Sequence, residues 1–234
     1  MIGRPRVHLR ETGSTNEHAR ALTAAGAPHG TLVTAGVQTE GRGRQGRRWE
    51  APAGSTLLLS LVIRGDLDPL LSLRAGLAVA DLAGPEARVK WPNDVLLDGR
   101  KVAGVLVEGR PQAGWAVLGL GVNVALDPRD LPLELRDSAG TLGRPAEELE
   151  GALGELLAAL ERWLEESAEA VVAALRDLDA LLGEPVRWSG GEGVGAGIDA
   201  RGGLIVAVAS GKTVVLEAGE VHLASKPPER QRRQ

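Results

Sequence analysis

The segment from Ser55 to Arg64, STLLLSLVIR, limits the folds open to this chain more than any other feature, because polar residues do not alternate with its apolar ones. A short continuous apolar run of this kind predicts a β-strand that is buried on both faces. Such a strand lies inside a sheet that other elements cover on either side. The chain must therefore supply further strands and covering elements.

Three other segments have helical patterns. Ser14 to Glu17 predicts a helix start in which Ser14 caps and Glu17 reaches back as in a capping box, followed by an Ala-rich helix to about Ala25. Leu70 to Leu82 suits a helix, and Ala146 to Leu182 predicts one or two amphipathic helices. Further strands are expected at 32–37, 101–107 and 115–124, so the content is mixed α and β.

The pattern changes after Gly183, where Gly-rich turns separate short strands. We expect these strands at 185–188, 195–199, 204–208, 213–216 and 220–223, and they predict a small β-barrel of about 45 residues. The chain is thus predicted to divide into a larger domain (residues 1–183), a barrel (184–225) and a charged, disordered tail (226–234).

Composition restricts both the core and the chemistry. The chain has no Phe, no Tyr and five Trp, so the core must consist of Leu, Val, Ala and Ile. The absence of Cys excludes disulfides, thiolate metal sites and cysteine nucleophiles. The four His residues lack ligand spacing, so a zinc site is not expected.

The overall charge bears on the partners. A formal net charge of −4 argues against bulk nucleic-acid binding. The sequence contains neither a signal-peptide pattern nor an apolar run of membrane-spanning length. We therefore expect a cytoplasmic protein with no nucleic-acid and no membrane partner.

Four arginines crowd into the stretch from Gly41 to Trp49, GRGRQGRRW, which we call the arginine loop. Glycines let backbone amides approach a phosphate closely, and guanidinium groups can hold it. The stretch also fits a solvated basic loop or an RNA-binding segment. Trp49 either packs in the core or forms a stacking surface for a base.

A second stretch, Lys90 to Asp94 (KWPND), precedes a predicted hairpin with its turn at Asp98-Gly99. A two-residue turn pairs residue 97 with 100 and 96 with 101. Asp94 and Lys101 then lie on one face as diagonal neighbours, with their Cα atoms roughly 7–8 Å apart. That separation leaves room for a small anionic group, with or without a metal ion. The alternative is a simple surface charge pair, which contributes little.

The third stretch is Gly119 to Asn123, GLGVN. Two glycines two positions apart in a strand indicate close approach by a backbone or a ligand. The stretch is not a dinucleotide-binding fingerprint, because the third glycine and the helix start are missing.

Together these stretches closely resemble the biotin–protein ligase family. The resemblance rests on Ser14-Thr15-Asn16, on Gln38 ahead of GRGRQGRRW, on KWPND followed by GRKVAGVLVE, and on GLGVN, all in the family's order and spacing. It covers most of residues 10 to 125, and more loosely the C-terminal module with its AGEV ending. It implies an α+β fold: a mixed β-sheet packed with helices, akin to class II aminoacyl-tRNA synthetase catalytic domains, followed by a small SH3-like β-barrel.

The resemblance implies ATP-dependent formation of biotinyl-5′-AMP from biotin and Mg-ATP, and then transfer of biotin to a lysine of a biotin carboxyl carrier protein. By resemblance, Ser14, Thr15 and Gln38 hydrogen-bond the ureido ring of biotin. The full set of biotin-binding residues so implied is Ser14, Thr15, Asn16, Gln38, Gly41, Arg42, Arg44, Lys101 and Gly104.

By the same resemblance, Lys101 contacts the biotin carboxylate and the α-phosphate, and Trp49 and Asn123 contact adenine. The implied ATP or adenylate set is Arg42, Arg44, Arg47, Trp49, Asn93, Lys101 and Asn123. The implied catalytic residues are Lys101, Arg44 and Asp94. Asp94 has three open roles: orienting an arginine, helping to hold Mg²⁺, or assisting deprotonation of the incoming lysine.

The sequence allows three rival functions, and one of them, a catalytically inert scaffold, is disfavoured because Lys101 and the full arginine loop are retained. A lipoate–protein ligase shares the fold and the adenylation chemistry, and a nucleic-acid-binding module could use the arginine loop and the barrel. Some family members carry an N-terminal helix-turn-helix and act as repressors, but too few residues precede Ser14 for one, so regulation of transcription is not inferred. Many relatives dimerise, so a homodimer is left open.

Overall fold

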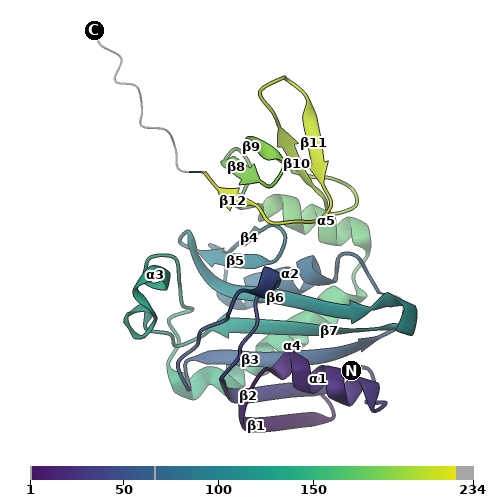
Figure 1. Cartoon of the computed structure of the whole chain (residues 1–234), viewed down its shortest axis with the longest axis vertical. Coiled ribbons are helices and arrows are strands. Elements are labelled where there is room, and N and C mark those ends of the chain that lie inside the picture. Colours follow the sequence, from purple (N-terminus) through teal and green to yellow (C-terminus); the bar gives the residue numbers. More distant parts are fainter. Residues whose placement is uncertain (1, 66, 225–234) are drawn as a thin grey trace.

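A computed structural model describes residues 2–65 and 67–224 of the chain (Figure 1). Two sheets organise it, one mixed sheet of seven strands and one antiparallel sheet of five. The predicted disordered tail, 226–234, lies outside the described residues. The mixed sheet, with helices on both faces, is the expected α+β fold.

The seven-stranded sheet has the order β1-β2-β3-β7-β6-β5-β4. β1 and β2 are parallel, and every other neighbouring pair is antiparallel. The strands are β1 (Arg6–Thr12), β2 (Leu32–Gln38), β3 (Thr56–Arg64), β4 (Arg88–Lys90), β5 (Asp94–Leu97), β6 (Arg100–Arg110) and β7 (Trp115–Asn123).

β3 is the strand predicted to be buried on both faces, and every residue except Arg64 is buried. α1 (Thr15–Ala24) packs on one face of the sheet. α2 (Leu71–Ala83) and α4 (Leu149–Glu165) pack on the other, and α5 (Ala168–Asp177) follows α4. In Figure 1, α1 lies in front of the strands, and α2 and α4 lie behind them.

The two faces carry different residues because side chains alternate along a strand. β3 and β7 pair Leu59 with Leu120, and Ser60 with Gly119. Leu59 and Leu120 belong to the core beneath α2 and α4, so we call this side the helix-layer face. Ser60 and Gly119 lie on the opposite side, the α1 face.

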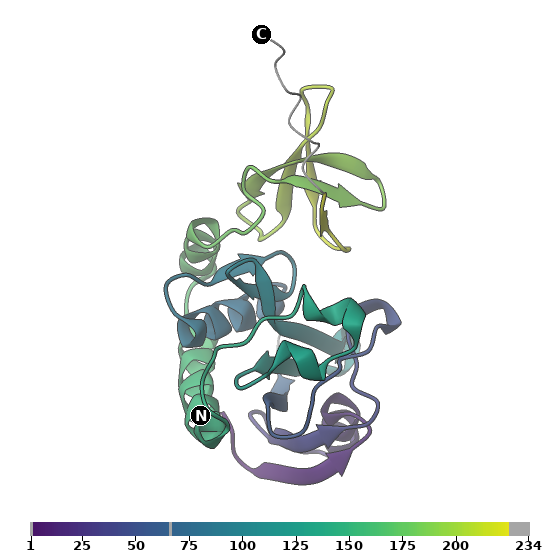
Figure 2. The same cartoon turned by 90° about the vertical axis from the view of Figure 1, so that its left-hand side faces the viewer.

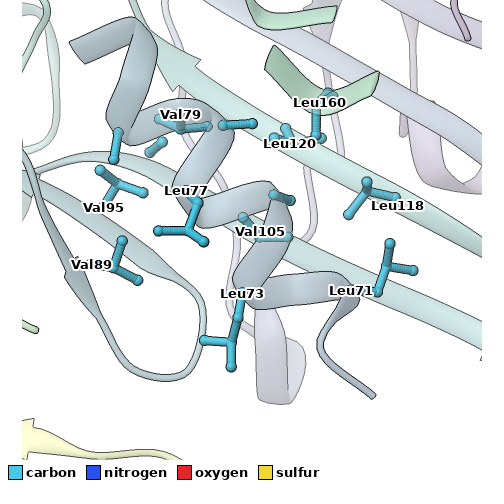
Figure 3. Packing of buried hydrophobic residues seen from close by; sticks show 14 of the residues in the cluster. Leu71, Leu73, Leu77, Val79, Val89, Val95, Val105, Leu118, Leu120 and Leu160 are labelled. Carbon is cyan, nitrogen blue, oxygen red and sulfur yellow. The ribbon is translucent and has the colours of Figure 1, made fainter. Parts of the chain in front are cut away.

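The helix-layer face holds the aliphatic core that the composition requires. Figure 3 shows the leucines and valines of α2 interdigitating with those of β4, β5, β6 and β7. Leu77 of α2 is fully buried there, and removing such a side chain from water contributes about 2 kcal/mol.

The five-stranded sheet has the order β11-β10-β9-β8-β12, an arrangement compatible with an SH3-like module. Its strands are β8 (Pro185–Trp188), β9 (Gly191–Ile198), β10 (Leu204–Ala207), β11 (Thr213–Leu216) and β12 (His222–Leu223). The predicted strand positions are confirmed, although β9 begins earlier and β12 later than expected. Closure into a barrel and a domain boundary at residue 183 stay predictions.

The C-terminal module, green to yellow in Figure 2, lies beside the larger sheet, and its Gly202, in the turn from Asp199 to Gly203, contacts Trp91 and α2. The indole Nε1 of buried Trp91 donates a hydrogen bond of 3.0 Å to the carbonyl of Gly202. Gly202 has φ +83°, and a Cβ there would lie 2.4 Å from Leu70 Cδ2. Only glycine fits this close to Leu70 at such a φ, so glycine lets the turn reach Trp91.

Three elements were not predicted: β1, β4 and α3 (Leu133–Arg136). β1 is an edge strand with many polar, exposed residues, so it lacks the apolar signal of a buried strand. The predicted capping box is wrong, because Ser14 stands at the N-cap but its side chain makes no capping hydrogen bond. Glu17 instead forms an ion pair with Arg42 at 2.9 Å.

Candidate active site

A cavity of about 440 Å³ lies over the α1 face of the seven-stranded sheet. It brings together nearly all the residues that the sequence singled out. These are Ser14, Thr15, Asn16, Gln38, Arg42, Arg44, Arg47, Trp49, Asn93, Asp94, Lys101, Gly104 and Asn123. Gly41 alone does not line it; a Cβ at Gly41 would meet the Trp49 carbonyl oxygen at 2.5 Å, so glycine lets the arginine loop close on itself.

A hydrogen-bonded set at the start of α1 orients Gln38. Thr15 donates to Gln38 Oε1 from both its backbone N at 2.7 Å and its Oγ1 at 3.0 Å. Buried Ser60 lies 2.8 Å from Thr15 Oγ1 and holds that hydroxyl in place. Because both contacts use the Gln38 oxygen, its amide nitrogen is left as a donor at the cavity. The Ser14 hydroxyl, which makes no helix cap, is also left for a ligand.

Hydrogen bonds with residues of β3 and β6 fix the side chain of Asn16. Its Oδ1 lies 2.6 Å from Ser60 Oγ, and its Nδ2 donates to Glu108 Oε2 at 2.8 Å. A Cβ added at Gly119 would lie 2.0 Å from Asn16 Oδ1, so the glycine makes room for this side chain. Both polar atoms of Asn16 therefore already have protein partners.

Two other glycines lie beneath Trp49. A Cβ at Gly121 would lie 2.4 Å from Trp49 Cε2, and one at Gly104 would lie 3.0 Å from Trp49 Cζ3. Trp49 is half-buried, and its ring lies with its centroid 5.5 Å from Lys101 Nζ, within cation–π range. Trp49 thus packs on a glycine surface at the site. Trp49 does not belong to the described hydrophobic core clusters, and its role as a stacking surface stays a prediction.

The KWPND hairpin places two lysines around one carboxylate. The turn is as predicted, with Asp98 and Gly99 at φ 51° and 73° and with Leu97 paired to Arg100. Lys101 Nζ, however, lies 2.7 Å from Asp94 Oδ1, so the expected gap between the two side chains is closed by an ion pair. The irregular register between Val95 and Leu96 accompanies this approach.

Lys90 is on the other side of the same carboxylate. Register pairs Lys90 with Asp94, and Lys90 Nζ lies 3.9 Å from Asp94 Oδ2. Burial lowers the pKa of Lys90, although the charge of Asp94 opposes this shift. Removal from water therefore outweighs the stabilisation that the carboxylate gives to the ammonium group.

Asn123 supports the backbone around Lys101. Its Nδ2 donates to Gly140 O at 2.9 Å, and the backbone N of Lys101 donates to Ser138 O at 2.8 Å. Ser138 and Ala139 thereby form a side of the cavity next to Lys101.

The arginine loop is folded and packs against both the hairpin and the C-terminal module. It contains a short 3-10 turn, Arg44–Gly46. Arg44 donates to Asn93 Oδ1 at 3.0 Å and to the Gly219 carbonyl at 2.9 Å. Arg47 forms an ion pair with Glu220. Residues from distant parts of the chain thus meet at this loop.

Sequence reasoning missed several contributors. Ser60 had no signal beyond being a polar residue inside a buried strand, and Lys90 was quoted in its motif but given no role. The loop and short helix that supply Leu131, Leu135 and Ala139 carry only a generic apolar pattern. The described apolar lining is aliphatic except for Trp49, as the lack of Phe and Tyr requires.

The described residues contain no group of three or more metal-ligating side chains that could hold an ion. Asp94, the residue considered for Mg²⁺, has a lysine on each side. Two adjacent ammonium groups oppose binding of a further cation, so the residues do not fit a metal held by the protein. No helix within residues 2–65 and 67–224 is both long and apolar enough to cross a membrane.

Comparison with known proteins assigns the chain and its fold to one class. The model of the Biotin/lipoate A/B protein ligase family matches residues 10–124. A solved structure, biotin protein ligase from Aquifex aeolicus in complex with biotin and ATP, superposes with a TM-score of 0.76 at 28% identity. The superposition covers 94% of this chain and 100% of that one.

Curated relatives with similar sequences are biotin ligases. The biotin–[acetyl-CoA-carboxylase] ligase of Mycobacterium tuberculosis is 38% identical over 91% of this chain and 86% of its own length. The Bacillus subtilis bifunctional ligase/repressor BirA is 36% identical over 63% of this chain, but the match spans 49% of that relative. The chain belongs to the biotin–protein ligase family.

Proposed function

We propose that this protein is an ATP-dependent biotin–protein ligase. It forms biotinyl-5′-AMP from biotin and Mg-ATP with release of pyrophosphate, and it transfers biotin to a lysine of a biotin carboxyl carrier protein. One observation carries the proposal: a single cavity brings together a set of hydrogen-bonding groups at α1, two lysines around Asp94, and an indole on a glycine surface.

Biotin presents a rigid polar ureido ring and an apolar body. A buried polar ring requires a partner for each donor and acceptor. The Ser14 hydroxyl and the Gln38 amide nitrogen are available for it, and Thr15 and Ser60 hold Gln38 in orientation. We assign Asn16 a supporting role, because its polar atoms already have protein partners. Gly104 and aliphatic side chains then face the apolar body of the ligand.

The first step joins two anions, since a carboxylate oxygen of biotin attacks the α-phosphorus while the bond to the β-phosphate breaks. Positive groups are needed to offset this repulsion and to stabilise the transition state. We assign Lys101 the contacts to both the carboxylate and the α-phosphate, because it lines the cavity and is held there by Asp94. Arg42 and Arg44 add positive charge from the arginine loop.

Asp94 holds Lys101 through its ion pair at 2.7 Å, and we assign it this orienting role rather than a metal-binding one. Mg²⁺ enters as part of Mg-ATP, where it neutralises phosphate charge. Asp94 lies between the two lysines at the cavity wall, and we also assign it the role of accepting a proton from the incoming acceptor amine.

The nucleotide contacts follow from the glycine surface and the arginine loop. Trp49 can stack on adenine. Asn123 shapes the backbone beside Lys101 through its Nδ2, and its Oδ1 accepts from Thr56 Oγ1 at 3.4 Å and has a second lone pair that can accept from the base. Asn93 positions Arg44. Arg47 lies at the edge of the cavity, where phosphates have room.

The acceptor lysine must reach the adenylate from outside. A second, larger cleft of about 1560 Å³ is lined by the arginine loop on its other side, and by residues of α2, β6 and the C-terminal module. We place the carrier protein at this cleft, so the arginine loop must move for transfer to occur. Because ATP is the co-substrate, we place the reaction in the cytoplasm.

The test supplies the purified protein with ATP, Mg²⁺ and either biotin or lipoate. Pyrophosphate release and the mass of the adenylate are measured, followed by labelling of a carrier domain. Biotinyl-adenylate and a biotinylated carrier are the expected products. Lipoyl-adenylate in place of biotinyl-adenylate would assign the protein to lipoate ligation, and no adenylate from folded protein would refute the proposal.

A further inference from the structure

Lys90 is a cation in the cavity that lacks a close partner. Its side chain is 18% exposed, and it lines the cavity beside Asp94. The 3.9 Å between Lys90 Nζ and Asp94 Oδ2 exceeds hydrogen-bond range. Within the part of the chain that the structure describes, no protein atom accepts a hydrogen bond from this ammonium group. A partly buried ammonium group without a close acceptor is unfavourable unless a ligand supplies the counter-charge.

The position of Lys90 distinguishes it from Lys101. The two lysines approach opposite oxygens of Asp94, Lys101 at Oδ1 and Lys90 at Oδ2. Lys101 is also beside Gly104 and the Trp49 ring, where the reacting carboxylate and α-phosphate are proposed to meet. Lys90 instead experiences the charges of Arg47 and Glu220.

We propose that Lys90, together with Arg47, binds the β- and γ-phosphates of ATP and stabilises the pyrophosphate that leaves. This assignment rests on the proposed function. When the carboxylate oxygen bonds to the α-phosphorus, the bridging oxygen departs with the β-phosphate and takes the electron pair of the broken bond. The leaving group gains negative charge at that moment, and a poorly solvated ammonium group beside it stabilises that charge strongly.

The desolvation of Lys90 fits this role. Burial lowers its pKa, so part of its stabilisation is missing before the triphosphate arrives. Polyanionic ligand supplies the missing counter-charge. Arg47 has to exchange its ion pair with Glu220 for a phosphate contact in the same step.

The two half-reactions separate the role of Lys90 from that of other residues. Adenylate formation involves the β- and γ-phosphates, but transfer from supplied biotinyl-5′-AMP to a carrier lysine does not. The variant Lys90→Met keeps the length of the side chain and removes its charge. We expect kcat/KM for ATP in pyrophosphate release to fall about 10- to 100-fold, as for a lost charged hydrogen bond. Transfer from supplied adenylate should keep the wild-type rate.

Lys212→Met is the matched control, because Lys212 is exposed in the turn between β10 and β11. It should retain both half-reactions. Lys90→Arg should recover part of the adenylation rate, since it restores a phosphate-binding cation. Calorimetry with magnesium pyrophosphate should show weaker binding to Lys90→Met than to the wild type. If Lys90→Met does not fold, Lys90→Gln is measured in the same way.

Equal losses in both half-reactions would overturn the assignment, because a general structural defect or an adenylate contact would produce them. Unchanged kcat/KM for ATP and unchanged pyrophosphate binding would overturn it as well. In either case wild-type adenylate formation leaves the proposed function standing. A wild-type protein that forms no adenylate overturns the proposed function itself.

Discussion

The two faces of the seven-stranded sheet are built from the same strands but carry different residues. On β3 and β7, Leu59 and Leu120 face α2 and α4, whereas Ser60 and Gly119 face α1. The helix-layer face is continuous aliphatic surface. The α1 face combines glycine, serine and asparagine with a cavity.

Along each of these strands, residues that stabilise the fold therefore alternate with residues that form the cavity. Apolar side chains on one face supply most of the burial that holds the sheet together. Glycines on the other face give up packing so that Asn16 and Trp49 can approach the strands. Substitutions on the two faces should therefore have different consequences.

The largest expected effect belongs to the α1 face. Lys101→Ala removes the group proposed to lie between the carboxylate and the α-phosphate. We expect adenylate formation to slow by about 10³-fold, as for other lost transition-state contacts. The dissociation constant for biotin should change much less. Rapid-quench measurement of biotinyl-5′-AMP and calorimetry with biotin test this, and equal losses in rate and affinity would contradict the assigned role.

The next effect belongs to the helix-layer face. Leu77→Ala leaves a cavity in the core beneath α2, so we expect the free energy of unfolding to fall by about 3 kcal/mol. Below the unfolding temperature, the kinetic constants should match those of the wild type. Urea denaturation and steady-state kinetics measure the two quantities. A large change in KM for either substrate would break the separation between the faces.

Ser60→Ala sharpens the comparison, because Ser60 lies on the α1 face but is fully buried. Loss of its hydroxyl leaves Thr15 Oγ1 and Asn16 Oδ1 without this partner. We expect KM for biotin to rise about tenfold and stability to fall by about 1 kcal/mol. KM for ATP should stay constant, and an equal rise in both KM values would show that Ser60 does not act through Gln38.

The smallest effect should arise away from both faces, at Asp179 between α5 and β8. Burial raises the pKa of this carboxyl, and its Oδ2 has no hydrogen-bond partner. The folded state therefore holds its proton more tightly than the unfolded state, and stability falls as pH rises above the ordinary value of 3.8.

Asp179→Asn removes this dependence and keeps an oxygen that can accept from Leu181 N. We expect the difference in unfolding free energy between variant and wild type to shift by less than about 1 kcal/mol between pH 4 and 7, in favour of the variant at higher pH. Denaturation of both proteins across this pH range measures the difference. The contributions of the other titrating groups cancel because both proteins share them. A difference independent of pH would show that Asp179 titrates normally.

Local signals in the sequence were sufficient for much of the fold. The apolar run of β3, the Asp98-Gly99 turn and the strands after Gly183 were predicted because each depends on residues close together in the chain. β1 was missed because an exposed edge strand needs few apolar residues. Strand order depends on contacts between distant segments, and no local pattern specifies it.

The candidate site shows the same division. The motif residues could be named from the sequence because they match the family in order and spacing. The structure brings nearly all of them to one cavity. Ser60 and Lys90 were missed because their roles arise from neighbours across strands: Ser60 reaches α1, and Lys90 faces Asp94 across a short hairpin. The open gap predicted between the side chains of Asp94 and Lys101 was wrong, because Cα spacing says little about where long side chains end.

Beside the ion pair of Glu220 with Arg47, two contacts of the C-terminal module with the rest of the protein use main-chain acceptors. Trp91 donates to the Gly202 carbonyl, and Arg44 donates to the Gly219 carbonyl. A carbonyl oxygen is the same in every residue type, so these two bonds place no demand on side-chain chemistry in the module. Sequence can therefore drift there while the junction persists, provided that the turns keep their backbone shape. A protein engineer could exchange the whole module for another whose turns present carbonyls at the same two points.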